Sequence, residues 1–154
     1  MIKIVITLLF LLINLHAVNQ NKITGNWYAN TRTLNNGTET IEKEYLSLNT
    51  DNTFSLTILV SVQKGEAFIK DLRIEVSGTW DSRDNTLVYV IKKVNVPIAK
   101  EVYHISQESL ENLAKNFKYK YENDNIHIGK IEYIDNTNFT LIGEKLRETK
   151  YQRQ

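Results

Sequence analysis

The chain has 154 residues, of which 42% are hydrophobic and 24% are charged, and it contains no cysteine. Its formal net charge of +1 at pH 7 provides no concentrated positive field, which argues against nucleic acid or an anionic membrane surface as the main partner. The absence of cysteine excludes disulfide bonds, thiol catalysis and cysteine metal ligands, so stability has to come from packing.

The N-terminus has the three parts of a secretory signal peptide. Lys3 precedes an almost unbroken apolar run over residues 4–13, and Ala17 supplies a small residue at a plausible cleavage point. The apolar run is about half as long as the roughly 20 residues that a membrane-spanning helix needs, although a retained membrane anchor stays the main alternative. We therefore predict a signal peptide over residues 1–17 and one exported domain over residues 18–154.

Cleavage of this segment changes the charge balance of the protein. It removes Lys3 from the 19 basic residues, which then equal the 18 acidic residues in number. We therefore expect a neutral, soluble protein of the periplasm or the extracellular space, with no integral membrane segment.

The exported part is dominated by alternation of apolar and polar residues, which is typical of half-buried β-strands because successive side chains point to opposite faces. The clearest runs cover residues 53–62 and 73–80. The tripeptide Asp-Asn-Thr occurs at 51–53, 84–86 and 135–137 and predicts hairpin turns, since Asp and Asn tolerate left-handed conformations. Shorter runs with the same alternation lie at 46–48, 87–91, 131–133 and 139–141.

One segment departs from this pattern. Residues 106–121 begin with Ser-Gln-Glu and then carry apolar residues at spacings of three and four, which predicts an amphipathic helix on the outside or the open end of the sheet. A helix lying on a membrane surface stays an alternative, but Glu108 and Glu111 dilute the positive charge of its polar face. The apolar face consists of Leu110, Leu113, Ala114, Phe117 and Tyr121.

About eight short strands with hairpin connections predict an all-β protein. Because the strands follow one another in sequence, an antiparallel up-and-down β-barrel with one late helix is favoured over a sandwich. An eight-stranded barrel has an interior that side chains fill or that holds one small ligand. The segment Thr31–Thr40 is predicted to be a long loop.

Several short motifs follow one another in a fixed order along this part of the chain. Gly-x-Trp at 25–27 is followed by Tyr45–Leu48, by a second Gly-x-Trp at 78–80 and by a closing Tyr151–Arg153. In this order they resemble the small bacterial lipocalin-like domains of the calycin superfamily, and Ile23–Trp27 also resembles the start of avidins. The resemblance implies the architecture of a barrel rather than a function, because one fold hosts many functions.

Two residues of the first motif are predicted to close one end of the barrel. Gly25 lets the backbone pass close to its neighbours, and Trp27 supplies a large apolar surface as a plug. For Trp80, both a place in the core and a place beside a ligand stay open. No tryptophan and no Trp-x-Gly-x-Tyr motif follow Trp80, so biotin binding is not expected.

No pattern in the sequence indicates catalysis. His104 and His127 are far apart, and metal sites usually need two or three ligands at suitable spacing, so both are interpreted as surface or structurally satisfied residues. Glu42 and Glu44 share a strand face and are interpreted as solvated charges at a sheet edge. Hydrolase, phosphate-binding and zinc-protease motifs are absent. We expect no catalytic residue, no metal and no cofactor, and therefore no enzyme.

Two functions are favoured by these features, and an enzyme on the same barrel is a third hypothesis that no residue pattern supports. The first is a carrier or sensor whose barrel mouth admits a small apolar molecule. The second is a filled barrel that binds a protein partner, as an inhibitor or an envelope accessory protein, through an edge, the helix or the loop Thr31–Thr40. A cavity open to solvent separates the first function from the second. The residues predicted to line a ligand are Phe54, Ile58, Ile74, Val76, Trp80 and Tyr89.

Overall fold

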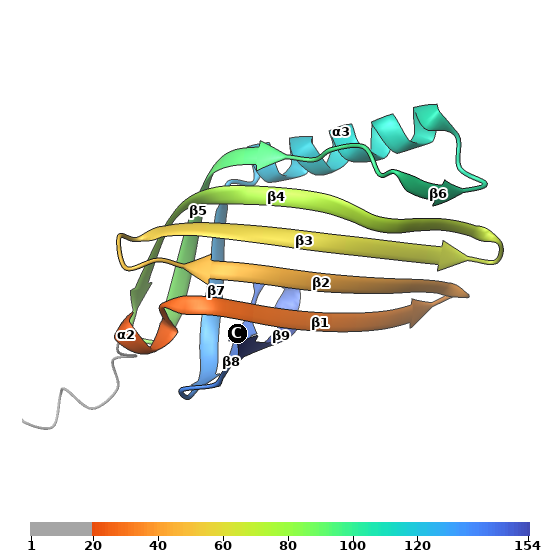
Figure 1. Cartoon of the computed structure of the whole chain (residues 1–154). Helices are drawn as coiled ribbons and strands as arrows, with labels where there is room; N and C mark the ends of the chain where they lie inside the picture. The colour runs from red at the N-terminus through yellow and green to blue at the C-terminus, as the bar shows by residue number, and fades with distance from the viewer. Residues whose placement is uncertain (1–19) are drawn as a thin grey trace, which may run out of the picture.

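The computed structural model describes residues 20–154, which form a closed antiparallel β-barrel with one long helix beside it (Figure 1). The predicted signal peptide, residues 1–17, lies outside the described residues. Within residues 20–154, no helix has both the length and the apolar composition that a membrane crossing requires.

Eight strands form the wall of the barrel. They are β1 (Gly25–Asn35), β2 (Thr38–Leu48), β3 (Thr53–Lys64), β4 (Ala67–Arg83), β5 (Thr86–Asn95), β7 (Ile126–Ile134), β8 (Asn138–Ile142) and β9 (Glu148–Arg153). Each wall strand pairs antiparallel with the next, and the ladder closes because β9 pairs with β1 and β3 with β4. This confirms the predicted up-and-down barrel, and the three Asp-Asn-Thr tripeptides lie at hairpin turns between strands.

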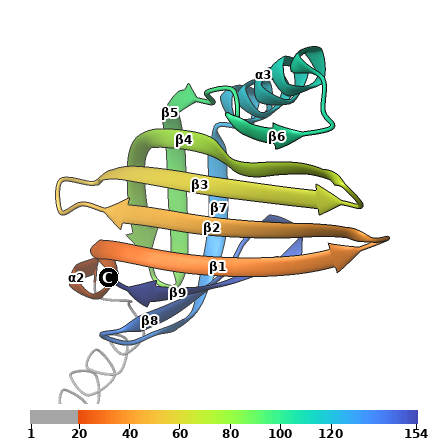
Figure 2. The ribbon, with the colours of Figure 1, turned by 45° about the vertical axis from the view of Figure 1, so that its right-hand side comes forward.

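The connection from β5 to β7 contains a short strand and the one long helix of the described residues. The short strand β6 (Glu101–Tyr103) pairs with the outer part of β4, and helix α3 (Gln107–Asn123) follows it. Ser106 caps α3, because its hydroxyl accepts a hydrogen bond from the amide of Ser109 at 3.2 Å. Leu110 and Ala114 are buried, and Figures 1 and 2 show α3 beside the end of β5. The predicted helix is confirmed, with an end two residues later than expected.

The predicted loop Thr31–Thr40 is wrong. β1 runs to Asn35 and β2 begins at Thr38, so only Asn36 and Gly37 turn the chain, with φ of 49° and 73°. Positive φ at both positions defines the two-residue type I′ hairpin, for which Asn-Gly is the favoured pair. Figure 2 shows this hairpin and the β3–β4 hairpin projecting beyond the shorter strands β8 and β9, so residues there bury little surface and follow no clear alternation.

The tightly packed core lies at the end of the barrel where the short helix α2 (Gln20–Ile23) precedes β1. Trp27 is fully buried there, and its indole Nε1 donates a hydrogen bond to the carbonyl of Ile23 at 2.7 Å. The edge of one ring faces the other between Trp27 and Phe139, whose ring centroids are 4.7 Å apart. On another side the guanidinium of Arg153 lies 4.1 Å from the indole centroid. The first and last strands therefore meet around one tryptophan.

Gly25 allows this contact between the two ends of the chain. Its φ of +132° is a conformation that glycine alone adopts readily, and a Cβ there would lie 2.2 Å from Nη1 of Arg153. The Arg153 guanidinium occupies that space and donates to the carbonyls of Thr24 at 2.8 Å and Lys22 at 2.6 Å. The structure thus places Gly25 and Trp27 against the same arginine.

Candidate functional site

A cavity of about 480 Å³ lies inside the barrel, away from the Trp27 core, and reaches the end of α3. Small-molecule sites have volumes of about 300–1,000 Å³ and combine an apolar wall with a few polar groups. One side of this cavity is aliphatic and aromatic and comes mainly from β3, β4 and β5. Its apolar side chains are Phe54, Leu56, Ile58, Val60, Ile74, Val76, Ile91, Leu141 and, from α3, Phe117.

The structure places five of the six residues predicted to line a ligand around this cavity, namely Phe54, Ile58, Ile74, Val76 and Tyr89. Trp80 is not among the lining residues. Its side chain is buried in the core, and its indole Nε1 donates to the carbonyl of Asn49 at 3.1 Å. Of the two placements open for Trp80, the structure gives the core.

The opposite side of the cavity is polar, and sequence reasoning missed it. Glu44, on the inward face of β2, is only 8% exposed. The hydroxyl of Tyr151 donates a hydrogen bond to Oε2 of Glu44 at 2.5 Å. The interpretation of Glu42 and Glu44 as solvated edge charges is wrong, because β2 is paired on both sides in a closed barrel and both residues line the cavity. One feature of the sequence could have revealed their inward position. Both glutamates lie an even number of residues from Leu46 and Leu48 on the same strand, so they share the face of these buried leucines.

Arg147 brings the two glutamates together from the β8–β9 connection, where it follows the 3₁₀ helix η1 (Glu144–Leu146). Its Nη2 donates to Oε2 of Glu42 and lies 3.4 Å from Oε1 of Glu44. One guanidinium therefore serves two carboxylates. Burial raises the pKa of Glu44, while the hydrogen bond from Tyr151 and the charge of Arg147 oppose that rise.

Tyr89, on β5, adds a polar group to the apolar wall. Its ring lies 5.1 Å from that of Phe54, and its hydroxyl is buried without a hydrogen-bond partner among the described residues. Burial, together with the charge of Glu44, raises the pKa of Tyr89 far above its usual range. Burial likewise raises the pKa of Tyr121, in α3, to about 12. Both phenols therefore stay neutral and can donate or accept a hydrogen bond.

We expect the protein without added ligand to lose stability as the pH rises through the folded-state pKa of Glu44. Burial raises this pKa above 4.5, so the folded state holds the proton more tightly than the unfolded chain does. The stabilisation is complete below the unfolded-state pKa and is lost as the pH rises through the higher folded-state value.

Urea denaturation of the wild type and of Glu44→Gln at a series of pH values measures this effect. Glutamine exchanges no proton, so the free energy of unfolding of the wild type minus that of the variant is expected to fall from acidic to neutral pH. A difference that is constant, or that grows with pH, would show that folding does not raise the pKa of Glu44.

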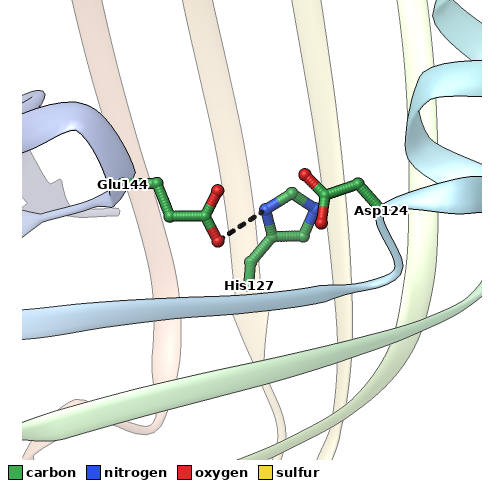
Figure 3. A group of neighbouring side chains, drawn as sticks. All are labelled: Asp124, His127 and Glu144. Atoms are coloured by element: carbon green, nitrogen blue, oxygen red, sulfur yellow. Dashed lines mark ion pairs between the residues drawn. The ribbon is translucent and has the colours of Figure 1, made fainter.

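His127 lies between two carboxylates at the mouth of the cavity (Figure 3). Its Nδ1 is 3.9 Å from Oε1 of Glu144, and Asp124 comes from the residue that ends α3. One possible ligand atom from each of the three residues lies within 4.8 Å of the others, so they could hold a divalent cation after a small contraction. Nε2 of His127 is buried without a hydrogen-bond partner among the described residues, whereas His104 is exposed.

The candidate site is therefore the cavity inside the barrel. It combines an apolar wall, the buried carboxyl group of Glu44, the unpaired hydroxyl of Tyr89 and a polar mouth. In comparisons with known proteins, no family model and no curated protein matches the chain.

Proposed function

We propose that this protein binds a small, largely apolar molecule inside the barrel, as an exported lipocalin-like carrier or sensor without catalytic activity. The observation that carries the proposal is the cavity of about 480 Å³ with its nine apolar lining side chains. The Gly-x-Trp motifs and the N-terminal signal pattern support the lipocalin-like and exported parts of the proposal.

The energetics of packing support a ligand. A barrel of eight strands is narrow enough for its own side chains to fill. Space left beside aliphatic side chains forfeits dispersion contacts and lowers stability roughly in proportion to its volume. A bound apolar molecule would restore these contacts, so the hollow interior is explained by binding.

The same observation weighs against the alternative of a filled barrel that acts on a protein partner. That function requires a solid core, and part of it depended on the loop Thr31–Thr40, which is a tight hairpin instead. We therefore place the proposed activity inside the barrel rather than on its surface.

Filling the cavity from its wall is expected to abolish binding. In Ile58→Trp the indole would occupy the space of a ligand, and we expect the affinity for the apolar dye N-phenylnaphthylamine to fall at least about tenfold, a loss of about 1.4 kcal/mol. The measurement is the fluorescence increase of the dye on titration with protein, and circular dichroism checks the fold of each variant.

Ser55→Trp is the matched control, because Ser55 is exposed on the outer face of the same strand. It is expected to bind the dye as the wild type does. Val76→Phe, from the neighbouring strand, repeats the test if Ile58→Trp does not fold. A wild type that does not bind the dye, or filled variants that bind it unchanged, would refute the proposal.

A further inference from the structure

We propose that the ligand is an amphipathic amine, with an apolar body against β3 and β4 and a protonated amino group beside Glu44 and Tyr89. This inference rests on the proposed function and adds the chemical class of the ligand.

The charge of the lining favours a cation. Four carboxyl groups line the cavity, against the basic side chains of Lys120, Arg147 and His127. Glu44 is the most buried carboxyl of the four, and a charge in such surroundings is screened weakly by water. The four carboxyl groups belong to Glu42, Glu44, Asp124 and Glu144.

A carboxylate head group placed beside Glu44 would find only Arg147 as a nearby cation among the described residues, because Lys120, the basic side chain of α3 in the lining, is exposed to solvent. Arg147 already contacts both Glu42 and Glu44, so its charge is more than balanced by the protein itself. A ligand acid approaching this guanidinium would also approach two glutamates, and like charges at close range are unfavourable. The position beside Glu44 therefore disfavours the head groups of fatty acids and other anionic amphiphiles.

Glu44 and Tyr89 together offer what an ammonium group needs. A carboxylate has about four acceptor positions, and Glu44 uses one for Tyr151 at 2.5 Å and a second, weakly, for Arg147 at 3.4 Å. The unpaired hydroxyl oxygen of Tyr89 is another buried acceptor. An ammonium group donates three hydrogen bonds and accepts none, so the acceptors of Glu44 and Tyr89 both suit it. A buried carboxylate without enough partners is costly, and a cationic ligand would remove much of that cost.

Three ligands with the same chain and different head groups test the inference. Octylamine, octanol and octanoate are titrated into the full-length mature protein by calorimetry at neutral pH, where octylamine is a cation and octanoate an anion. We expect octylamine to bind about tenfold more tightly than octanol, a difference of about 1.4 kcal/mol, and octanoate to bind most weakly.

Glu44→Gln is expected to remove the preference for octylamine over octanol. Tyr89→Phe is expected to reduce the preference in part, and it also serves if Glu44→Gln does not fold. The matched control is Glu132→Gln, on the exposed face of β7, which should keep the wild-type order. Equal affinities for octylamine and octanol in the wild type would overturn the amine inference while leaving the proposed function intact. Failure of all three ligands and of N-phenylnaphthylamine would overturn both.

Discussion

Replacing Trp27 with alanine is expected to lower the free energy of unfolding by about 3–5 kcal/mol, the range typical for loss of a large buried aromatic side chain. Trp27 is fully buried, packs edge-on against Phe139 and donates a hydrogen bond to Ile23. The variant loses the apolar contact area, leaves the Ile23 carbonyl without its indole donor and removes the ring under the Arg153 guanidinium. Urea denaturation followed by circular dichroism measures the change.

Two variants separate the contributions at this site. Trp27→Phe keeps an aromatic ring and loses the indole hydrogen bond, so a smaller cost of about 1–3 kcal/mol is expected. Tyr28→Ala removes the neighbouring aromatic from the outer face, where its ring contacts that of Tyr45, and should cost no more than about 1 kcal/mol. If Trp27→Ala is no more destabilising than Tyr28→Ala, Trp27 does not hold this end of the barrel closed.

Gly78→Ala is expected to destabilise the protein by about 3 kcal/mol or more. A Cβ at this position would lie 1.9 Å from the carbonyl oxygen and 2.9 Å from the carbonyl carbon of Val90. Both contacts are with backbone of the adjacent strand β5, at the point where the register between Ser77 and Gly78 shifts, so no side chain can rotate away. Overpacking usually costs about 1–3 kcal/mol, and contact with fixed backbone belongs at the upper end of that range.

Gly143→Ala provides the comparison for this prediction. Gly143 precedes η1 with φ of −83°, and a Cβ there would lie 3.8 Å from the nearest atom, the carbonyl oxygen of Arg147. We expect its free energy of unfolding to stay within about 0.5 kcal/mol of the wild type. Similar values for Gly78→Ala and Gly143→Ala would contradict the close approach of β4 and β5.

The barrel was predictable from sequence because most of its determinants are local. The alternation over residues 53–62 indicates the two faces of one strand. The repeated Asp-Asn-Thr indicates turns, because Asp and Asn favour turn conformations of the backbone. The Asn36–Gly37 hairpin was equally local, but its flanking strands project past the core and carry polar residues on both faces. Because neither flank shows alternation of apolar and polar residues, the sequence pattern predicts a loop there despite Asn36-Gly37, a favoured hairpin dipeptide.

The candidate site was predictable only on its apolar side. Parity along β3 and β4 suffices to point Phe54, Ile58, Ile74 and Val76 in the same direction. The polar side depends on closure of the barrel, because Glu44 meets Arg147 and Tyr151 across separations of 103 and 107 residues. Sequence periodicity carries no information on such contacts, so it cannot distinguish these glutamates from charges at a sheet edge, although β2 has no free edge.

Methyl-resolved NMR during a titration with octylamine tests the central claim, binding inside the barrel, most directly. We expect the methyl signals of Ile58, Ile74, Val76 and Leu141, which line the cavity, to shift and saturate together. The methyl signals of Ile126 and Ile128, which are 52% and 55% exposed on the outer face of β7, should stay unchanged. Shifts confined to the outer isoleucines, or no saturable shift at any cavity methyl, would contradict the account.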